Sequence, residues 1–150
     1  MAPSVLIHLP VVDLAASRSF YTALGWTPDP GFSDQHAVTV VAGEGLWVVL
    51  LDHLTFRGRA DKDITDTRRC ASVITSLSVA TPEEVDVFVD RAVAAGAPEG
   101  RPQDQDFLRS RSFQDPDGHL WEIVWMDPLA SSGNWTAVQQ KYPLEGSGHA

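Results

Sequence analysis

The sequence predicts an α+β fold in which two βαβββ modules form one curved mixed sheet, a cup with the helices outside. The chain has 150 residues, enough for one domain or for two small halves that share a core. Both halves show the same order of elements, and a constant shift that places Leu9 on Leu77 also places Phe20 on Phe88. One half-sheet with one helix cannot bury both of its faces. Two such units are therefore expected to share a cup.

The first module is expected over residues 4–52. Alternating apolar residues predict a first strand, which Pro10 marks as an edge strand. The expected elements are, in chain order, a strand over 4–12, a helix over 14–24 that Asp13 caps and Gly25 ends, and strands from residue 26, over 37–41 and over 46–51.

A linker is expected over residues 53–71, which are rich in charge and show no sustained periodicity. The second module follows over 72–128 and begins with a strand over 72–79. Thr81 and Glu84 form a capping box around Pro82, which predicts a helix that ends at Gly96. Strands over 107–114 and 119–126 complete the module. Residues 1–128 thus make up the domain.

Residues 129–150 are expected to be a C-terminal extension. Its ends, Ser131-Ser132-Gly133 and Gly146-Ser147-Gly148, are typical of flexible segments. Its middle, residues 135–142, is apolar enough to dock on the domain or on a second subunit. We expect a homodimer.

Composition argues against several classes of partner. With a net charge of -9 and only 11 Lys and Arg residues, the chain has no basic footprint for nucleic acid or an anionic membrane. No apolar run approaches the roughly 18 residues of a membrane span, and the N-terminus does not resemble a signal peptide. A cytoplasmic location is expected. Cys70, the single cysteine, is a weak candidate nucleophile because no His lies near it in the sequence.

Chemistry is expected to converge on the stretch from Asp115 to Trp125. Asp-Pro-Asp-Gly predicts a tight turn, because Pro fixes φ and Gly accepts a positive φ. In the strand that follows, Trp121 and Ile123 share the core face, whereas Glu122 lies on the other face. That carboxylate must point either into water or into a pocket. Taken alone, it is typical of a solvated surface residue.

These motifs resemble the vicinal oxygen chelate superfamily, which includes glyoxalase I, the bleomycin and fosfomycin resistance proteins and the extradiol dioxygenases. The resemblance rests on Val11-Val12-Asp13-Leu14, on Ser19-Phe20-Tyr21 with Leu24-Gly25-Trp26, and on Asp115-Pro116-Asp117-Gly118-His119 followed by Glu122. It covers the chain to about Pro128 and is closest to small bacterial proteins described as predicted lactoylglutathione lyases. It implies a cup that holds a divalent metal, with one ligand from the first and one from the last strand of each module.

Only one of the four implied ligand positions matches. Glu122 stands at the last-strand position of the second module. The first-strand positions hold Leu6 and Ile74, and the remaining position falls on Val48 or Leu50. Aliphatic side chains cannot coordinate Zn²⁺, Mn²⁺ or Fe²⁺, which need three or four ligands. No metal and no cofactor are therefore expected.

His8 shares the inner face of the first strand with Leu6, and its repeat partner is Ser76. Three interpretations remain open for His8. It is a hydrogen-bonded core histidine, or it binds a metal weakly together with Glu122, or it contacts a ligand or acts as a general base opposite Glu122.

The resemblance and the missing ligands favour metal-independent binding of a small organic molecule in the cup. The alternative is a glyoxalase-type lyase or isomerase that uses His8 and Glu122 as acid and base, with or without a weakly bound divalent metal. The candidate ligand-binding residues are His8, Trp47, Leu50, Ser76, Arg111 and Glu122. Arg109 and Arg111 alternate with Ser110 and Ser112, so either the arginines face the cup and an anionic ligand follows, or the serines do and the ligand is neutral.

Overall fold

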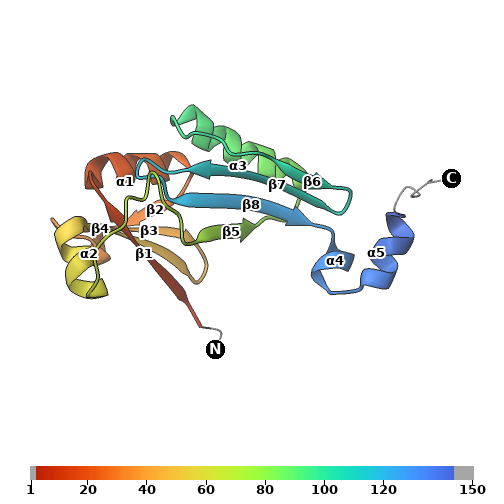
Figure 1. The fold of residues 1–150 in the computed structure, drawn as a ribbon, viewed down its shortest axis with the longest axis horizontal. Coiled ribbons are helices and arrows are strands. Elements are labelled where there is room, and N and C mark those ends of the chain that lie inside the picture. The colour runs from red at the N-terminus through yellow and green to blue at the C-terminus, as the bar shows by residue number, and fades with distance from the viewer. Residues whose placement is uncertain (1–2, 144–150) are drawn as a thin grey trace.

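The computed structural model describes residues 3–143 and shows two modules with the same topology (Figure 1). In the first module, strand β1 pairs in parallel with β4, which continues antiparallel to β3 and then β2. The elements of this module are β1 (Val5–Val11), α1 (Leu14–Ala23), β2 (Thr27–Asp29), the 3-10 helix η1 (Pro30–Phe32), β3 (Ala37–Gly43) and β4 (Leu46–Asp52).

The second module repeats this arrangement with the order β5-β8-β7-β6, again with one parallel pair at the edge. Its elements are β5 (Ile74–Ser78), α3 (Pro82–Ala94), β6 (Gln103–Gln105), β7 (Leu108–Gln114) and β8 (Leu120–Met126). The predicted α+β fold of two βαβββ modules is confirmed. The two four-stranded sheets remain open and share no strand pairing. We call them the first and the second sheet.

Helix α2 (His53–Ala60) occupies the first half of the segment expected to be a linker. Its ends are defined locally. The Asp52 side chain accepts a hydrogen bond from the Thr55 backbone N–H, and Asp61 ends the helix in the left-handed conformation at φ 51°. No residue of α2 is buried, so no apolar stripe marks it in the sequence.

Both modules contribute to one hydrophobic core. Helices α1 and α3 lie side by side and cover the same face of the two sheets (Figure 1). Tyr21 stacks on Trp26 with ring centroids 5.1 Å apart, and Trp121 of the second module contacts both rings. Phe113 on β7 contacts Phe20 on α1 in the same way. The modules therefore form a single cooperative unit.

The Asp-Pro-Asp-Gly turn ties the second module to the first, and we call residues 115–119 the junction turn. Asp117 accepts a hydrogen bond from the Val12 backbone N–H at 2.9 Å. The imidazole of His119 donates from Nε2 to the Pro10 carbonyl at 2.8 Å. Tyr21 donates from its hydroxyl to Asp115 at 2.6 Å. Both aspartates are buried against the first module. Chemistry was expected to converge on the stretch from Asp115 to Trp125. The junction turn at its start is instead a structural connection between the two modules.

The C-terminal extension forms helices α4 (Pro128–Ser131) and α5 (Trp135–Lys141), which stand beyond the end of the second sheet (Figure 1). Trp135 packs edge-on against Phe107 with centroids 5.9 Å apart, and the Tyr142 hydroxyl donates to Asp127 at 2.8 Å. The 135–142 segment therefore docks on its own domain, and Ser131 lies in a helix rather than in a flexible segment. Gly146-Ser147-Gly148 lies outside the described residues. Among residues 3–143, no helix has the length and apolar character needed to cross a bilayer.

Gly118 should be the least replaceable glycine of the chain. At φ +85°, an added Cβ would lie 2.5 Å from the Thr67 carbonyl oxygen. Gly133 has a similar φ of +76°, but nothing lies within 4 Å of its added Cβ. Gly133→Ala should cost about 1–2 kcal/mol of backbone strain, and Gly118→Ala roughly 3 kcal/mol or more. Denaturant unfolding of the two variants checks this, and equal losses would contradict the close approach.

Tyr21→Phe should reduce stability in a pH-dependent way. Burial raises the pKa of Asp115 above its usual 3.8, and the Tyr21 hydroxyl opposes that rise by stabilising the carboxylate. Because folding raises the pKa of Asp115, the folded state binds more protons than the unfolded state. The free energy of unfolding therefore falls as the pH rises through that pKa.

Removing the hydroxyl raises the pKa of Asp115 further. The variant should therefore lose about 1–3 kcal/mol of unfolding free energy near pH 7 and less near pH 4, where a larger fraction of Asp115 is protonated. The difference between wild type and variant, measured by urea unfolding at the two pH values, isolates this group. A loss that is larger near pH 4 contradicts the assignment.

Candidate functional site

The concave face of the first sheet carries a cavity of about 670 Å³, which we call the first-sheet cavity. Its floor is formed by side chains that alternate out of the sheet on the side away from α1. Leu6 and His8 come from β1, Trp47 and Val49 from β4, and Thr39 from β3. Their neighbours in sequence point the other way, into the core. The strand alternation thus separates the cavity face from the core face.

One wall of the cavity is the segment around η1. Ser33 donates from its hydroxyl to the Asp29 carbonyl at 2.6 Å, and Thr39 donates to the Phe32 carbonyl at 2.7 Å. These two bonds hold η1 over the end of β3. Phe32 remains 76% exposed and belongs to the cavity lining. Arg59 of α2 also lines the cavity.

His8 is exposed at this cavity rather than packed in the core, which removes the core-histidine interpretation. Within residues 3–143 its ring makes no hydrogen bond to another side chain or to the backbone. Trp47 is half-buried and lies in the same cavity. The structure therefore brings two of the sequence-predicted residues together.

Glu122 faces the concave side of the second sheet. Its carboxylate accepts a hydrogen bond from the Ser110 hydroxyl at 2.6 Å and a second from the Ser76 hydroxyl. Ser76 lies directly opposite Glu122 in the β5–β8 pairing. Neither Glu122 nor Ser76 lines the first-sheet cavity. Within one chain, His8 and Glu122 therefore lie on different sheets and do not share this cavity.

Strand register corrects the position that matches Glu122 in the first module. His8 pairs with Val49 in the first sheet, as Ser76 pairs with Glu122 in the second. The counterpart of Glu122 is therefore Val49, and not Val48 or Leu50.

Each module has a turn followed by Leu-Trp, at Leu46-Trp47 and at Leu120-Trp121, and this likeness favours the positions Val48 and Leu50. The strand pairing instead places Leu120 at the position of Trp47, one residue further along. A slip of one residue moves every side chain to the opposite face of a strand. Leu50 is accordingly 0% exposed in the core and cannot contact a ligand on the concave face.

Arg111 also lies on the opposite face from the one expected of a ligand-binding residue. Its guanidinium contacts Asp86 and Asp90 of α3, each at 3.0 Å, and Glu99 at 2.8 Å. Arg109 likewise pairs with Asp86 at 2.7 Å. These ion pairs attach β7 to α3.

The serines of β7 consequently face the concave side, where Ser112 pairs with Glu122 in the strand register. Of the two alternatives in the sequence, the serines are thus on the cup side. Asp86 and Asp90 stand four residues apart and so share one face of α3. Together with the alternating arginines of β7, this spacing was the sequence signal that could have predicted the ion pairs.

The donor atoms on the concave faces do not fit a transition-metal site. The positions that the resemblance assigns to ligands hold Leu6, Val49, Ile74 and Glu122, and only the last has a donor atom. Across residues 3–143, no group of three or more His, Cys, Asp or Glu side chains is arranged to hold a metal ion. One carboxylate is too few for Zn²⁺ or Mn²⁺.

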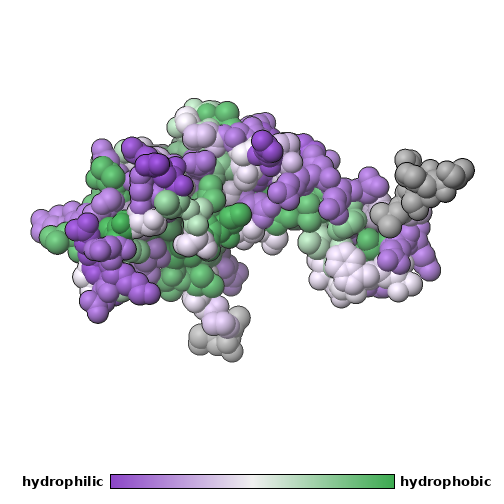
Figure 2. Space-filling view, viewed as in Figure 1, coloured by the Kyte–Doolittle hydropathy of each residue, from purple (hydrophilic) through white to green (hydrophobic). Residues whose placement is uncertain are grey.

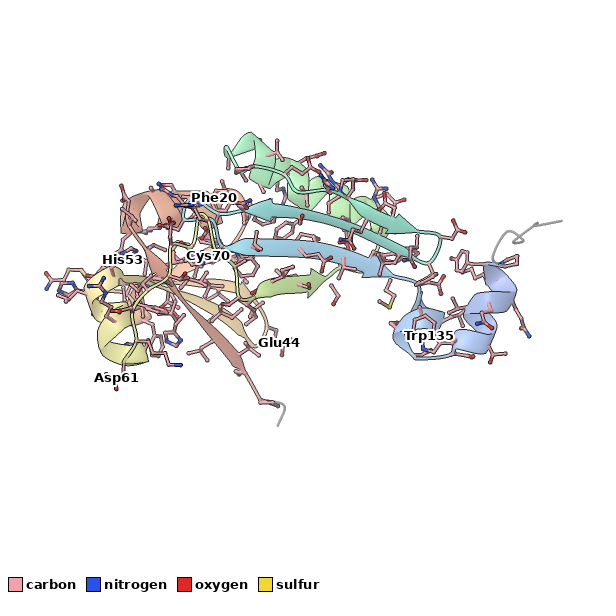
Figure 3. The ribbon with its side chains drawn as sticks, in the orientation of Figure 1. Phe20, Glu44, His53, Asp61, Cys70 and Trp135 are labelled. Carbon is pink, nitrogen blue, oxygen red and sulfur yellow. The ribbon has the colours of Figure 1, made fainter. Side chains whose placement is uncertain are left out.

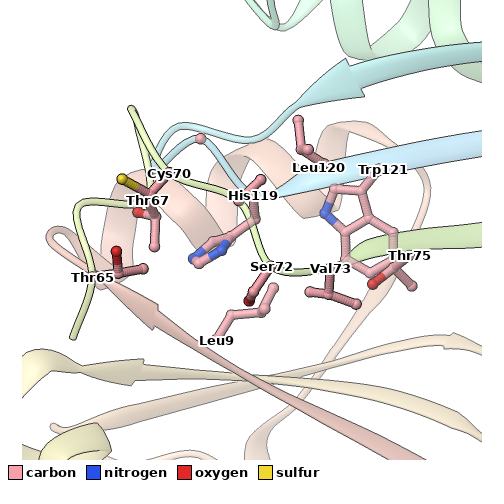
Figure 4. A pocket seen from close by; sticks show the side chains of 12 residues that line it. Leu9, Thr65, Thr67, Cys70, Ser72, Val73, Thr75, His119, Leu120 and Trp121 are labelled. Carbon is pink, nitrogen blue, oxygen red and sulfur yellow. The ribbon is translucent and has the colours of Figure 1, made fainter. Parts of the chain in front are cut away.

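Cys70 lines a second, much smaller pocket of about 50 Å³ beside the junction turn (Figure 4). His119 lies in the same pocket, although the two are far apart in sequence. The Cys70 sulfur is directed away from the His119 ring in Figure 4. The ring instead donates a hydrogen bond to the Pro10 carbonyl. The pocket has room for water but not for an organic substrate.

The side chains of η1 and α2 at the first-sheet cavity were missed by sequence reasoning. Asp29, Phe32 and Asp34 fall in a segment rich in Pro and Gly, and Arg59 falls in the expected linker. Such segments carry no periodicity that would show which way a side chain points. Only their packing beside the sheet places them at the cavity.

Comparison with solved structures gives close agreement in fold. A hypothetical protein from S. aureus is 28% identical and superposes with a TM-score of 0.70 over 83% of this chain and 94% of that chain. A glyoxalase-related enzyme from Fulvimarina pelagi is 26% identical, with a TM-score of 0.70 over 83% of this chain and 88% of that one.

A third structure is that of a mutant of the fosfomycin resistance protein FosX from Listeria monocytogenes, complexed with Mn(II) and 1S,2S-dihydroxypropylphosphonic acid. It is 18% identical and superposes with a TM-score of 0.67 over 90% of this chain and 99% of that chain. At that identity the likeness shows the fold alone. No protein with a curated description matches the chain.

The family model of the Glyoxalase/Bleomycin resistance protein/Dioxygenase superfamily matches residues 4–123, from the start of the first strand into β8. This range includes the first module, the cavity, the junction turn and the second module up to the first half of β8. The chain is a member of the Glyoxalase/Bleomycin resistance protein/Dioxygenase superfamily.

Proposed function

We propose that the protein binds a small organic molecule in the first-sheet cavity and does so without a metal. The observation that carries this proposal is the cavity itself. It is concave, has a volume of about 670 Å³, and combines Trp47 and Leu6 with a few polar groups such as His8. This is the size and chemistry of a pocket for a small molecule. The FosX structure, with its bound phosphonic acid, is a relative in fold that holds a small organic molecule.

Metal independence rests on the donor set of the concave faces. The FosX complex contains Mn(II). In this chain the four corresponding positions hold Glu122, Leu6, Val49 and Ile74, of which only Glu122 has a donor atom. Both Glu122 oxygens also accept hydrogen bonds from serines. Binding energy must therefore come from the aromatic floor and from hydrogen bonds. The same residue set argues against a metal-dependent lyase.

We propose that the chain forms a homodimer. Val5 and Leu6 on β1 are 53% and 54% exposed, and Val73 and Ile74 near the start of β5 are 64% and 61% exposed. Hydrophobic residues gather along β1 and in the middle of the molecule (Figure 2). Exposed apolar residues on two free sheet edges favour association, because contiguous patches of this kind are uncommon on monomers.

The second candidate function, a lyase or isomerase with His8 and Glu122 as acid and base, depends on such a dimer. Both residues face concave surfaces, but on different sheets of one chain. A second copy that places its second sheet over the first-sheet cavity would bring Glu122 to His8. General acid–base catalysis requires both groups within hydrogen-bond reach of one substrate.

We further propose a cytoplasmic location and no nucleic-acid partner. The net charge of -9 opposes contact with phosphates, and the Cys70 thiol is exposed and unpaired with any other cysteine.

Ligand binding should depend on His8 and Trp47 and should not depend on metal. In a thermal-shift screen of small organic molecules, hits should raise the melting temperature equally with and without EDTA. Trp47→Leu and His8→Ala should each weaken binding by about tenfold or more, because each loses a contact with the bound molecule.

His53→Ala is the matched control for His8→Ala, since His53 is exposed on α2 and does not line the cavity. Hits that vanish in EDTA, or hits that bind both cavity variants with full affinity, would disprove the proposal.

Light scattering should give the mass of a dimer, and Leu6→Asp or Ile74→Asp should shift the protein toward monomer, because a charge buried at an interface without a partner is costly. Leu54→Asp should leave the mass unchanged, since Leu54 is 80% exposed on α2 and lies on neither β1 nor β5. A monomeric wild type would refute the dimer.

A further inference from the structure

We infer that the occupant of the first-sheet cavity is an elongated, flat aromatic molecule that carries an acidic group at one end and a basic group at the other. The inference rests on the proposed binding function and specifies its ligand class. It follows from two aromatic surfaces in one cavity, and from unpaired groups of opposite charge on its two walls.

The aromatic surfaces are those of Trp47 and Phe32. Trp47 stands on the floor, and Phe32 belongs to the η1 wall, where 76% of it is exposed. The backbone hydrogen bonds of Ser33 and Thr39 hold this wall in place, so the Phe32 ring is presented at the cavity rather than on a free loop. A planar ring bound in this cavity has the aromatic side chains of Trp47 on the floor and Phe32 on the wall to contact. Aromatic pairs favour such contacts beyond simple burial of area.

The basic wall comes from α2. This helix packs against β1 and β4 and stands at one end of the first sheet, where its ends are marked by His53 and Asp61 in Figure 3. Arg59 is the α2 side chain that lines the cavity. Within residues 3–143 it forms no ion pair, in contrast to Arg109 and Arg111, which are paired with carboxylates. A guanidinium in this position is free to bind an acidic group of a ligand.

The acidic groups are Asp29 at the end of β2 and Asp34 just after η1. Asp29 uses one carboxylate oxygen to accept the Gly31 backbone N–H at 2.9 Å, and Asp34 uses one to accept the His36 backbone N–H at 2.7 Å. The second oxygen of each carboxylate accepts no hydrogen bond from the part of the chain that the structure describes. Both residues line the cavity. Each therefore retains an acceptor for a cationic or N–H-bearing ligand group.

Arg59 comes from α2, which contacts β1 and β4, whereas Asp29 lies on β2 at the other side of the strand order. β1 and β2 are the outer strands of the order β1-β4-β3-β2, so three inter-strand spacings of about 4.8 Å place them roughly 14 Å apart. Two aromatic rings in line with a charged group at each end match this spacing, from Arg59 on α2 to Asp29 on β2. An exclusively anionic ligand would be repelled by the two carboxylates, and an exclusively cationic ligand would be repelled by the Arg59 guanidinium.

A matched set of biphenyl probes tests this inference. The bipolar probe carries a carboxylate at one para position and an aminomethyl group at the other. Three relatives replace the carboxylate, the aminomethyl group or both by hydroxymethyl, and a fifth has saturated rings. Binding is followed by NMR shifts of the Trp47 indole N–H, assigned with Trp47→Phe, and by the dissociation constants from titration.

The bipolar probe should bind about tenfold tighter than either singly charged probe and than the saturated one, because each end adds a charge-assisted hydrogen bond. Arg59→Gln should reduce its affinity to that of the ammonium-only probe and leave the latter unchanged. The double variant Asp29→Asn, Asp34→Asn should reduce the affinity of the bipolar probe to that of the carboxylate-only probe and leave the latter unchanged. Asn is chosen because it keeps the oxygen that accepts the backbone N–H. Arg57→Gln, on the same helix but outside the cavity lining, is the control and should change nothing.

Equal affinities across the charged and neutral probes, or equal affinity of the saturated one, would overturn the inference while leaving binding at Trp47 intact. The inference would also fail, and the proposed function survive, if hits from the thermal-shift screen move the Trp47 indole signal and no biphenyl does. If neither biphenyls nor screen hits move that signal, both are overturned.

Discussion

The junction turn is the constraint on which the rest of the structure depends. Two buried carboxylates, Asp115 and Asp117, would each carry a large desolvation cost if left without donors. They meet those donors on α1 and at the end of β1, at Tyr21 and Val12. The same turn holds the Pro10 carbonyl through His119. Because β1 also carries His8, the hydrogen bonds that join the modules hold the floor of the cavity as well.

The two sheets have one topology but different concave surfaces. At matching register positions, His8 and Val49 in the first sheet correspond to Ser76 and Glu122 in the second. The first surface is largely apolar and hollowed, whereas the second presents a carboxylate whose oxygens are already hydrogen-bonded to serines. Family membership accounts for the shared topology and leaves the ligand undetermined, since one fold hosts many functions.

The short segments beside the first sheet supply aromatic and charged side chains to the cavity lining. Phe32 comes from η1 and Arg59 from α2, and neither element contains a buried residue. Both are held by local hydrogen bonds, such as the cap that Asp52 provides for α2. The strands form the floor of the cavity, while these short connecting segments place charged and aromatic side chains beside it.

The sequence by itself determined the two modules, their helices and the core aromatic residues, because periodic burial and capping are local and repeat along the chain. It also located Glu122 and His8 on concave faces, since strand alternation settles which face a side chain takes. Tertiary structure alone decided the strand register that moves Leu50 into the core, the ion pairs that turn Arg111 toward α3, and the approach of Arg59 to the cavity. Register and side-chain partners depend on contacts between distant segments, and a one-residue shift between such segments reverses every face.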